Sequence, residues 1–145
     1  MRSPLKRLAP VLAGSFFFMA GALGLNAQIT NAIQARINHS FMIGDKSLPP
    51  GQYTFRMENG SDLLVMDVQN QNGDNVAQFM VRQSIDNRRP RHSEVVFRKY
   101  GNTEFLSKIY EHGSKSGVAV TQTGKEEARL VNEGQHPVEH AEEQP

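Results

Sequence analysis

The strongest catalytic signature in this chain lies near its C-terminus, where His136-Pro137-Val138-Glu139-His140 fits the pattern H-x-x-E-H. In the inverted zinc proteases, two imidazoles one helical turn apart bind zinc and a carboxylate serves as general base. Here a proline would sit at the helix start, and only five residues follow the second histidine, too few for a third ligand. We therefore interpret the motif as a chance match and predict no metal site and no cofactor, with at most weak metal capture by the tail.

A second chemical candidate is His39, which lies between Ile37 and Phe41 at an inward-facing position of a predicted strand. The simpler interpretation is a strand histidine that a neighbouring backbone or carboxylate group satisfies. The alternative is a small-ligand pocket or active site around His39, completed by His92 or His112. The spacing of serines and carboxylates identifies no Ser-His-Asp set. We therefore predict that the protein is not an enzyme.

The third candidate is a basic segment that could bind anions. Its members are Arg82, Arg88, Arg89, Arg91, Arg98 and Lys99. Arginine forks bind phosphate, sulfate and carboxylate groups in pairs, which predicts a contact with anionic envelope polymers or lipid headgroups. The alternative is a solvated loop whose arginines keep the sheet edge soluble or pair with the acidic tail. Nucleic acid is not predicted as a partner, because no aromatic residue is interleaved in the loop.

Residues 1–27 have the pattern of a secretory signal peptide. A basic start precedes an uncharged apolar run from Val11 to Leu25, and the small residue Ala27 offers a cleavage position. We predict cleavage after Ala27 and export to the periplasm or the extracellular space. The alternative is an uncleaved membrane anchor, because the apolar stretch approaches the roughly 18 residues that can span a bilayer.

The cleavage would change the charge of the chain. Removing Arg2, Lys6 and Arg7 from the 16 basic residues leaves 13 against 15 acidic ones, so the mature net charge is −2. The chain has no cysteine, which excludes disulfides and a thiol nucleophile. A mature chain of 118 residues (145 less 27) must therefore be held together by its hydrophobic core alone.

Seven stretches between the signal and residue 120 have strand patterns, and no long helical period separates them. They cover residues 30–43, 52–58, 63–68, 76–82, 94–100, 104–110 and 118–120. The first is expected to bend near His39, and the third is apolar enough to be a central strand covered on both faces. Residues 28–132 are therefore predicted to form an antiparallel β-sandwich or open barrel of about seven strands.

Turn residues punctuate these strands. Pro50 and Gly51 fit positions i+1 and i+2 of a type II turn, which requires a positive φ at Gly51. Asn59-Gly60 and Gly101-Asn102 are hairpin signals. Gly44-Asp45 ends the strand before the type II turn.

The C-terminal part departs from the strand pattern. Thr123 and Glu126 have the spacing of a capping box, which predicts a short helix over residues 126–132 that packs Ala128, Leu130 or Val131 on the sheet. Residues 133–145 are rich in Glu, Gln, His and Pro and are predicted to be a disordered acidic tail.

The stretch around the Pro50 turn also carries a resemblance. The pattern F-x-x-G-x-x-x-L-P-x-G-x-Y is present as Phe41, Gly44, Leu48, Pro49, Gly51 and Tyr53. It resembles that of a family of small exported bacterial β-domain proteins of unassigned function, and residues 96–110 are similar to a second segment of that family. The resemblance covers most of residues 35–130 and implies secretion, a β fold and a final short helix. The family usually has an aromatic residue where His39 stands.

The function predicted from these features is a secreted or periplasmic, non-catalytic binding or structural module of the cell envelope. Its anionic partner would lie against the basic segment. Two alternatives remain, namely a small-ligand pocket or enzyme around His39, and a surface protein that associates with itself through open edge strands.

Overall fold

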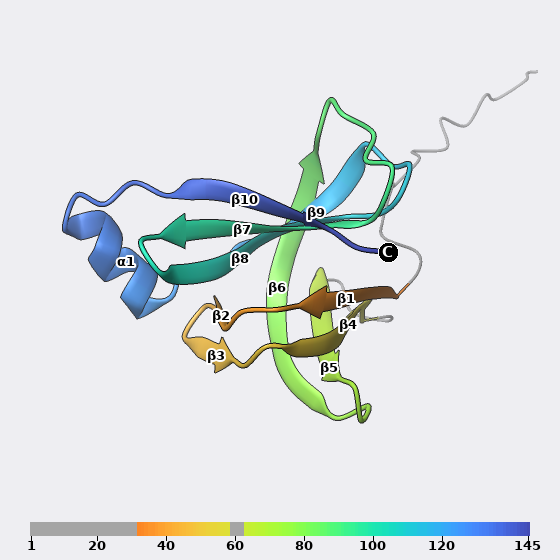
Figure 1. Ribbon diagram of the computed structural model, residues 1–145, viewed down its shortest axis with the longest axis horizontal. Helices are drawn as coiled ribbons and strands as arrows, with labels where there is room; N and C mark the ends of the chain where they lie inside the picture. The colour runs from red at the N-terminus through yellow and green to blue at the C-terminus, as the bar shows by residue number, and fades with distance from the viewer. Residues whose placement is uncertain (1–31, 59–62) are drawn as a thin grey trace, which may run out of the picture.

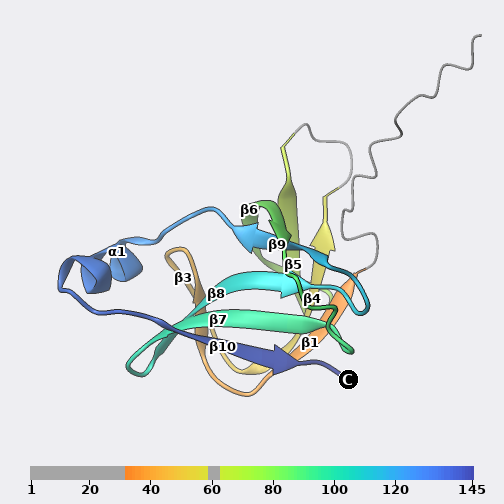
Figure 2. The same cartoon turned by 90° about the horizontal axis from the view of Figure 1, so that it is seen from above.

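The computed structural model describes residues 32–58 and 63–145, which form ten strands and one short helix (Figures 1 and 2). The elements are β1 (Ile33–Ile37), β2 (Phe41–Ile43), β3 (Lys46–Leu48), β4 (Gly51–Met57), β5 (Val65–Asn70), β6 (Asn75–Ile85), β7 (Glu94–Tyr100), β8 (Thr103–Tyr110), β9 (Ser116–Val120), α1 (Lys125–Asn132) and β10 (Val138–Glu143). The predicted all-β class with a short C-terminal helix is confirmed. The predicted signal peptide and the Asn59-Gly60 turn lie outside the described residues.

Strand β6 joins the two halves of the sheet because it pairs with a different neighbour along each half of its length. Residues Asn75 to Met80 pair with β5, and residues Val81 to Ile85 pair with β9. From there the sheet continues through β4 to β1 on one side, and through β8 to β7 and β10 on the other. Figure 1 shows β6 as a long curved strand that connects the two groups.

The two halves face each other across one hydrophobic core. The core takes buried side chains from β1, β4 and β5 on one side and from β2, β7, β8 and β9 on the other. Alternation places every second residue of β1 inside, as the period-two pattern predicts. Phe41, Phe55 and Phe97 are among the largest fully buried side chains. The result is one ten-stranded sheet folded over its own core.

The strand count differs from the predicted seven for three reasons. The first predicted strand divides at His39 into β1 and β2, the residues after Gly44 form the short strand β3, and the tail contributes β10. The prediction that the third strand is covered on both faces is wrong. Buried and half-buried residues alternate along β5, and Leu63 before it is 57% exposed.

The positive backbone angle predicted at Gly51 is found at Gly44 instead. Gly44 has φ +57° in the tight turn between β2 and β3, whereas Gly51 is the first residue of β4 and has no positive φ. A Cβ at Gly51 would lie 3.5 Å from the Tyr53 ring, which is an ordinary van der Waals contact, so space does not require glycine there. The Tyr53 hydroxyl donates a hydrogen bond to the Pro49 carbonyl and so ties the turn to β4.

Helix α1 forms where predicted, but its N-terminus is capped by a distant residue. Its N-cap is Gly124, and no capping-box hydrogen bond from Thr123 is present. Asp45, in the β2–β3 turn, accepts a hydrogen bond from the Lys125 backbone N–H at 2.6 Å. Gly124 allows this approach, because a Cβ there would lie 2.3 Å from the Gly44 carbonyl oxygen.

The prediction of a disordered tail is wrong for the final residues. Strand β10 pairs antiparallel with β7 along its whole length, and Figure 1 shows it at the edge of the sheet beside β7. Beyond it, Gln144 is 3% exposed and accepts a hydrogen bond from the Arg36 backbone N–H of β1 at 2.7 Å. Backbone pairing and polar contacts order this segment. Because it buries no apolar side chains, its sequence lacks the hydrophobic pattern that would predict a strand.

We expect Gly117→Ala to destabilise the protein by about 2 kcal/mol, as overpacking a close contact does. A Cβ at Gly117 would lie 2.4 Å from both the Ile109 carbonyl oxygen and the Tyr110 ring, and backbone cannot yield as a flexible side chain can. Urea denaturation measures the change. The comparison variant is Gly113→Ala, where a Cβ meets nothing within 4 Å and only the positive φ opposes alanine, at a cost of about 1 kcal/mol. Equal losses in the two variants would contradict the close-contact explanation.

Candidate functional site

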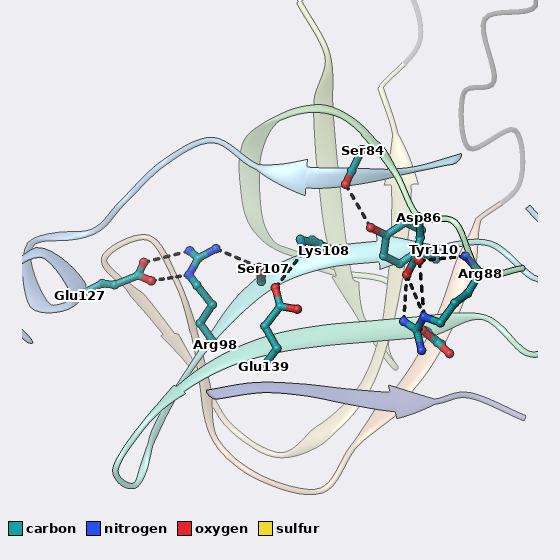
Figure 3. Close-up of polar contacts among 10 residues, drawn as sticks. Ser84, Asp86, Arg88, Arg98, Ser107, Lys108, Tyr110, Glu127 and Glu139 are labelled. Atoms are coloured by element: carbon teal, nitrogen blue, oxygen red, sulfur yellow. Dashed lines mark hydrogen bonds and ion pairs between the residues drawn. The ribbon is translucent and has the colours of Figure 1, made fainter. Parts of the chain in front are cut away.

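The fold separates the six residues predicted to bind anions into two groups. Three of them have acidic partners, namely Arg88, Arg98 and Lys99. The others are Arg82, Arg89 and Arg91, which are exposed and have no ion pair within the described part of the chain. Figure 3 shows the polar contacts that engage Arg88 and Arg98.

Arg98 is held in a largely buried pair with the helix. Its guanidinium donates to both carboxylate oxygens of Glu127, at 2.5 and 3.1 Å, and to the Ser107 hydroxyl at 2.9 Å. Glu127 is buried, and the Tyr100 hydroxyl donates to it as well. Burial lowers the pKa of Arg98, but the hydrogen bonds and charge of Glu127 outweigh it and raise that pKa overall. This bidentate pair fixes α1 to the sheet and leaves Arg98 with no free fork for an external anion.

Arg88 and Lys99 are neutralised locally. The Arg88 side chain donates to Asp86 at 2.9 Å, and this hydrogen bond lowers the pKa of the Asp86 carboxyl. Lys99 lies 3.6 Å from a carboxylate oxygen of Glu104. The acidic tail takes part too, since Glu139 of β10 pairs with Lys108 at 2.8 Å (Figure 3). Pairing with neighbouring acids therefore accounts for half of the predicted surface.

Two of these unpaired arginines, Arg89 and Arg91, lie on the loop after β6, whereas Arg82 lies within β6 opposite Ala119 of β9. The loop after β6 lies beside the turn after β8, because the Asp86 backbone N–H donates to the Lys115 carbonyl and the Gly113 N–H donates to the Pro90 carbonyl. This brings exposed Lys115, which has no ion pair among the described residues, next to the loop that carries Arg89 and Arg91. We call these three residues the basic tip.

His39 lies in the bend between β1 and β2, half-buried against the ring of Phe97 at a centroid distance of 4.8 Å. The residues gathered around it are Glu104 of β8 and both His140 and Glu142 of β10. One possible ligand atom from each of the four residues lies within 4.8 Å of the others, and this is the one such group among residues 32–58 and 63–145. We call these four residues the His39 cluster.

The predicted partners of His39 are not in this cluster. His92 and His112 are exposed on the loops at the basic tip, so the pocket predicted from them does not form. Of the H-x-x-E-H motif, only His140 belongs to the cluster, while Glu139 pairs with Lys108. Strand alternation places His140 and Glu142 on the same side of β10, a signal that appears only when the tail is interpreted as a strand.

No helix among the described residues is long and apolar enough to cross a membrane. Comparisons of the chain with protein-family models, with curated proteins and with solved structures find no match. The function is therefore inferred from the geometry of the basic tip and of the His39 cluster.

Proposed function

We propose that this protein is a non-catalytic binding module, exported to the cell envelope, that contacts anionic polymers through its basic tip. The observation that supports the proposal is the backbone pairing that sets Lys115 beside Arg89 and Arg91. Three exposed cations without acidic partners attract polyanions, because their charge is not neutralised locally. Phosphate or sulfate groups are the chemistry that arginine forks recognise.

We expect the triple variant Arg89→Ala, Arg91→Ala, Lys115→Ala to elute from a heparin column at a clearly lower salt concentration than the parent protein. The matched control removes three other exposed cations from elsewhere on the surface, namely Lys46, Arg56 and Lys125. Both triple variants change the net charge by the same amount, so only a local site separates them. Equal elution of the parent and the basic-tip variant would rule the proposal out.

A second arm distinguishes a polymer from a lipid. Co-sedimentation with phosphatidylglycerol vesicles tests the headgroup as the source of phosphate. Binding to heparin without binding to vesicles supports the polymer, whereas vesicle binding that the basic-tip variant loses assigns the surface to lipid. The salt dependence of either retention confirms its electrostatic origin, because exposed charges are screened within about 8 Å at physiological ionic strength.

A further inference from the structure

The His39 cluster places two imidazole rings between two carboxylates. On one side, Nδ1 of His39 lies 2.8 Å from Glu104 and Nδ1 of His140 lies 3.2 Å from the same carboxylate. On the other side, Nε2 of His39 lies 2.5 Å from Glu142 Oε1 and Nε2 of His140 lies 3.8 Å from it. All four ring nitrogens therefore face carboxylate oxygens.

Neutral imidazoles cannot satisfy this arrangement alone. A carboxylate only accepts hydrogen bonds, and a neutral imidazole has one N–H and one lone pair. The Nδ1 of His39 lies 3.1 Å from the Ser40 carbonyl and its Nε2 lies 2.5 Å from Glu142 Oε1, and both oxygens can only accept, so a neutral His39 leaves one of these two contacts without a proton. If His39 carries its proton on Nδ1 and His140 carries its proton on Nε2, one nitrogen lone pair faces each carboxylate, and one ligand atom from each of the four residues lies within 4.8 Å of the others. A cation among these atoms would relieve the repulsion.

Glu104 gives an independent indication. It is 5% exposed, and its Oε2 is buried without a hydrogen bond from any described residue. The 2.8 Å approach of His39 Nδ1 does not supply one, because an N–H on that nitrogen would be aligned with the Ser40 carbonyl. Buried carboxylate oxygens without a partner are costly, and an unsatisfied one in a native fold points to an absent ligand or ion.

We propose that the His39 cluster is a binding site for a divalent transition-metal ion, with Zn²⁺ as the best fit. Two imidazole nitrogens and two carboxylates are a four-ligand set that zinc accepts, at bond lengths of about 2.0–2.2 Å. Adjacent ligands in such a tetrahedron lie about 3.3 Å apart, so atoms already within 4.8 Å need only small side-chain rotations. Ca²⁺ and Mg²⁺ fit less well, since they prefer oxygen ligands throughout.

The surroundings of the cluster suit a metal site. The Nδ1 of His39 lies 3.1 Å from the Ser40 carbonyl, so a His39 bound to metal through Nε2 would donate from Nδ1 to that carbonyl, the outer contact that fixes the orientation of metal-bound histidines. The buried ring of Phe97 forms an apolar floor under His39. Lys99 lies 3.6 Å from Glu104 and partly offsets its charge, so its removal should favour the cation.

The proposed ligands come from three segments of the chain that only the tertiary fold brings together. Substitutions can therefore distinguish metal binding at the His39 cluster from metal binding at the H-x-x-E-H motif of the tail. Competition titration of the purified protein with Zn²⁺ and a chromophoric chelator should show one zinc per chain. We expect His39→Gln and Glu142→Gln each to weaken binding by about tenfold or more. His136→Gln and Glu139→Gln alter the H-x-x-E-H motif outside the cluster and should leave the affinity unchanged, while Lys99→Gln should tighten binding.

Two outcomes would overturn the proposal. The first is a protein that does not bind Zn²⁺. The second is Zn²⁺ binding that survives His39→Gln but is lost with His136→Gln, because that result would assign the metal to the tail motif. Because Glu104 is buried, its substitution risks the fold, so His39→Gln and Glu142→Gln carry the test, with circular dichroism as the folding check. Replacing Zn²⁺ with Co²⁺ gives a second readout, since tetrahedral and octahedral Co²⁺ differ in visible absorption. An octahedral spectrum would contradict the four-ligand site. The result is independent of heparin retention, which depends on the basic tip.

Discussion

We expect Phe97→Ala to lower the free energy of unfolding by about 4 kcal/mol, in the range that removal of a buried aromatic ring costs. Phe97 is fully buried at the centre of β7, and its ring meets that of Phe41 edge-on at a centroid distance of 5.6 Å. Such edge-to-face pairs add about 0.5–1.5 kcal/mol beyond area burial. Small domains have only about 5–15 kcal/mol of stability, so the variant loses a large fraction of it.

Urea denaturation of the parent and the variant measures this loss, with an unchanged m-value as the check on two-state behaviour. The control is Ile85→Ala, which truncates an apolar side chain that is 77% exposed and should change stability by no more than about 0.5 kcal/mol. A loss below about 1.5 kcal/mol for Phe97→Ala would mean that the neighbouring side chains collapse into the cavity. His39 packs on the same ring, so the variant should also weaken Zn²⁺ binding.

The second large effect is expected for Glu127→Ala, at about 3 kcal/mol of lost stability. Removing one partner of a buried ion pair leaves the other charge without compensation, which costs about 3–5 kcal/mol. The Arg98 side chain retains 24% exposure, so water recovers part of this cost and the lower end of the range applies. The variant also removes the acceptor of the Tyr100 hydroxyl, so α1 loses both polar connections that Glu127 makes to β7.

A double-mutant cycle with Arg98→Met and Glu127→Leu measures the interaction energy between the two side chains, apart from the effect of each single substitution. If the single losses come from an isolated buried charge, the double variant should be more stable than the sum of the two single losses predicts. Simple additivity would contradict the pairing explanation. Arg129→Ala is the matched control on the same helix, because its partners Glu126 and Glu133 are exposed and such pairs contribute little.

The alternation of apolar residues was a reliable guide to β1 and β4, because each of these strands has one face on the core and the burial period is two. Strands β7 and β8 are buried at most positions without that alternation, so their β-branched and aromatic composition predicted them, and not the period. Glu94 to Tyr100 forms β7 with the predicted bounds. The same logic failed for β10. Val138 is its one large apolar residue and is 69% exposed, so this strand forms by pairing its backbone with β7 and not by burying side chains.

The arginine-rich segment shows a second limit of prediction from sequence, namely that composition does not identify ion-pair partners. Its composition predicted an anion surface, but which arginines are free depends on acids far away in the sequence. Glu127 is 29 residues from Arg98, and their pairing exists only because α1 packs against β7 and β8. The composition also allows these arginines to pair with the acidic tail, but the fold pairs Arg88 with Asp86 and Arg98 with Glu127, neither of which lies in the tail.

Among the residues that could do chemistry, the sequence by itself singled out His39 and the H-x-x-E-H segment and identified a β domain around them. It could not join them, because a separation of 101 positions between His39 and His140 leaves their distance in space undetermined until β10 pairs with β7. The tertiary structure decided that His140 belongs with His39, Glu104 and Glu142, and that Glu139 does not. The physical reason is that strand pairing fixes register, and register decides which side chains share a face.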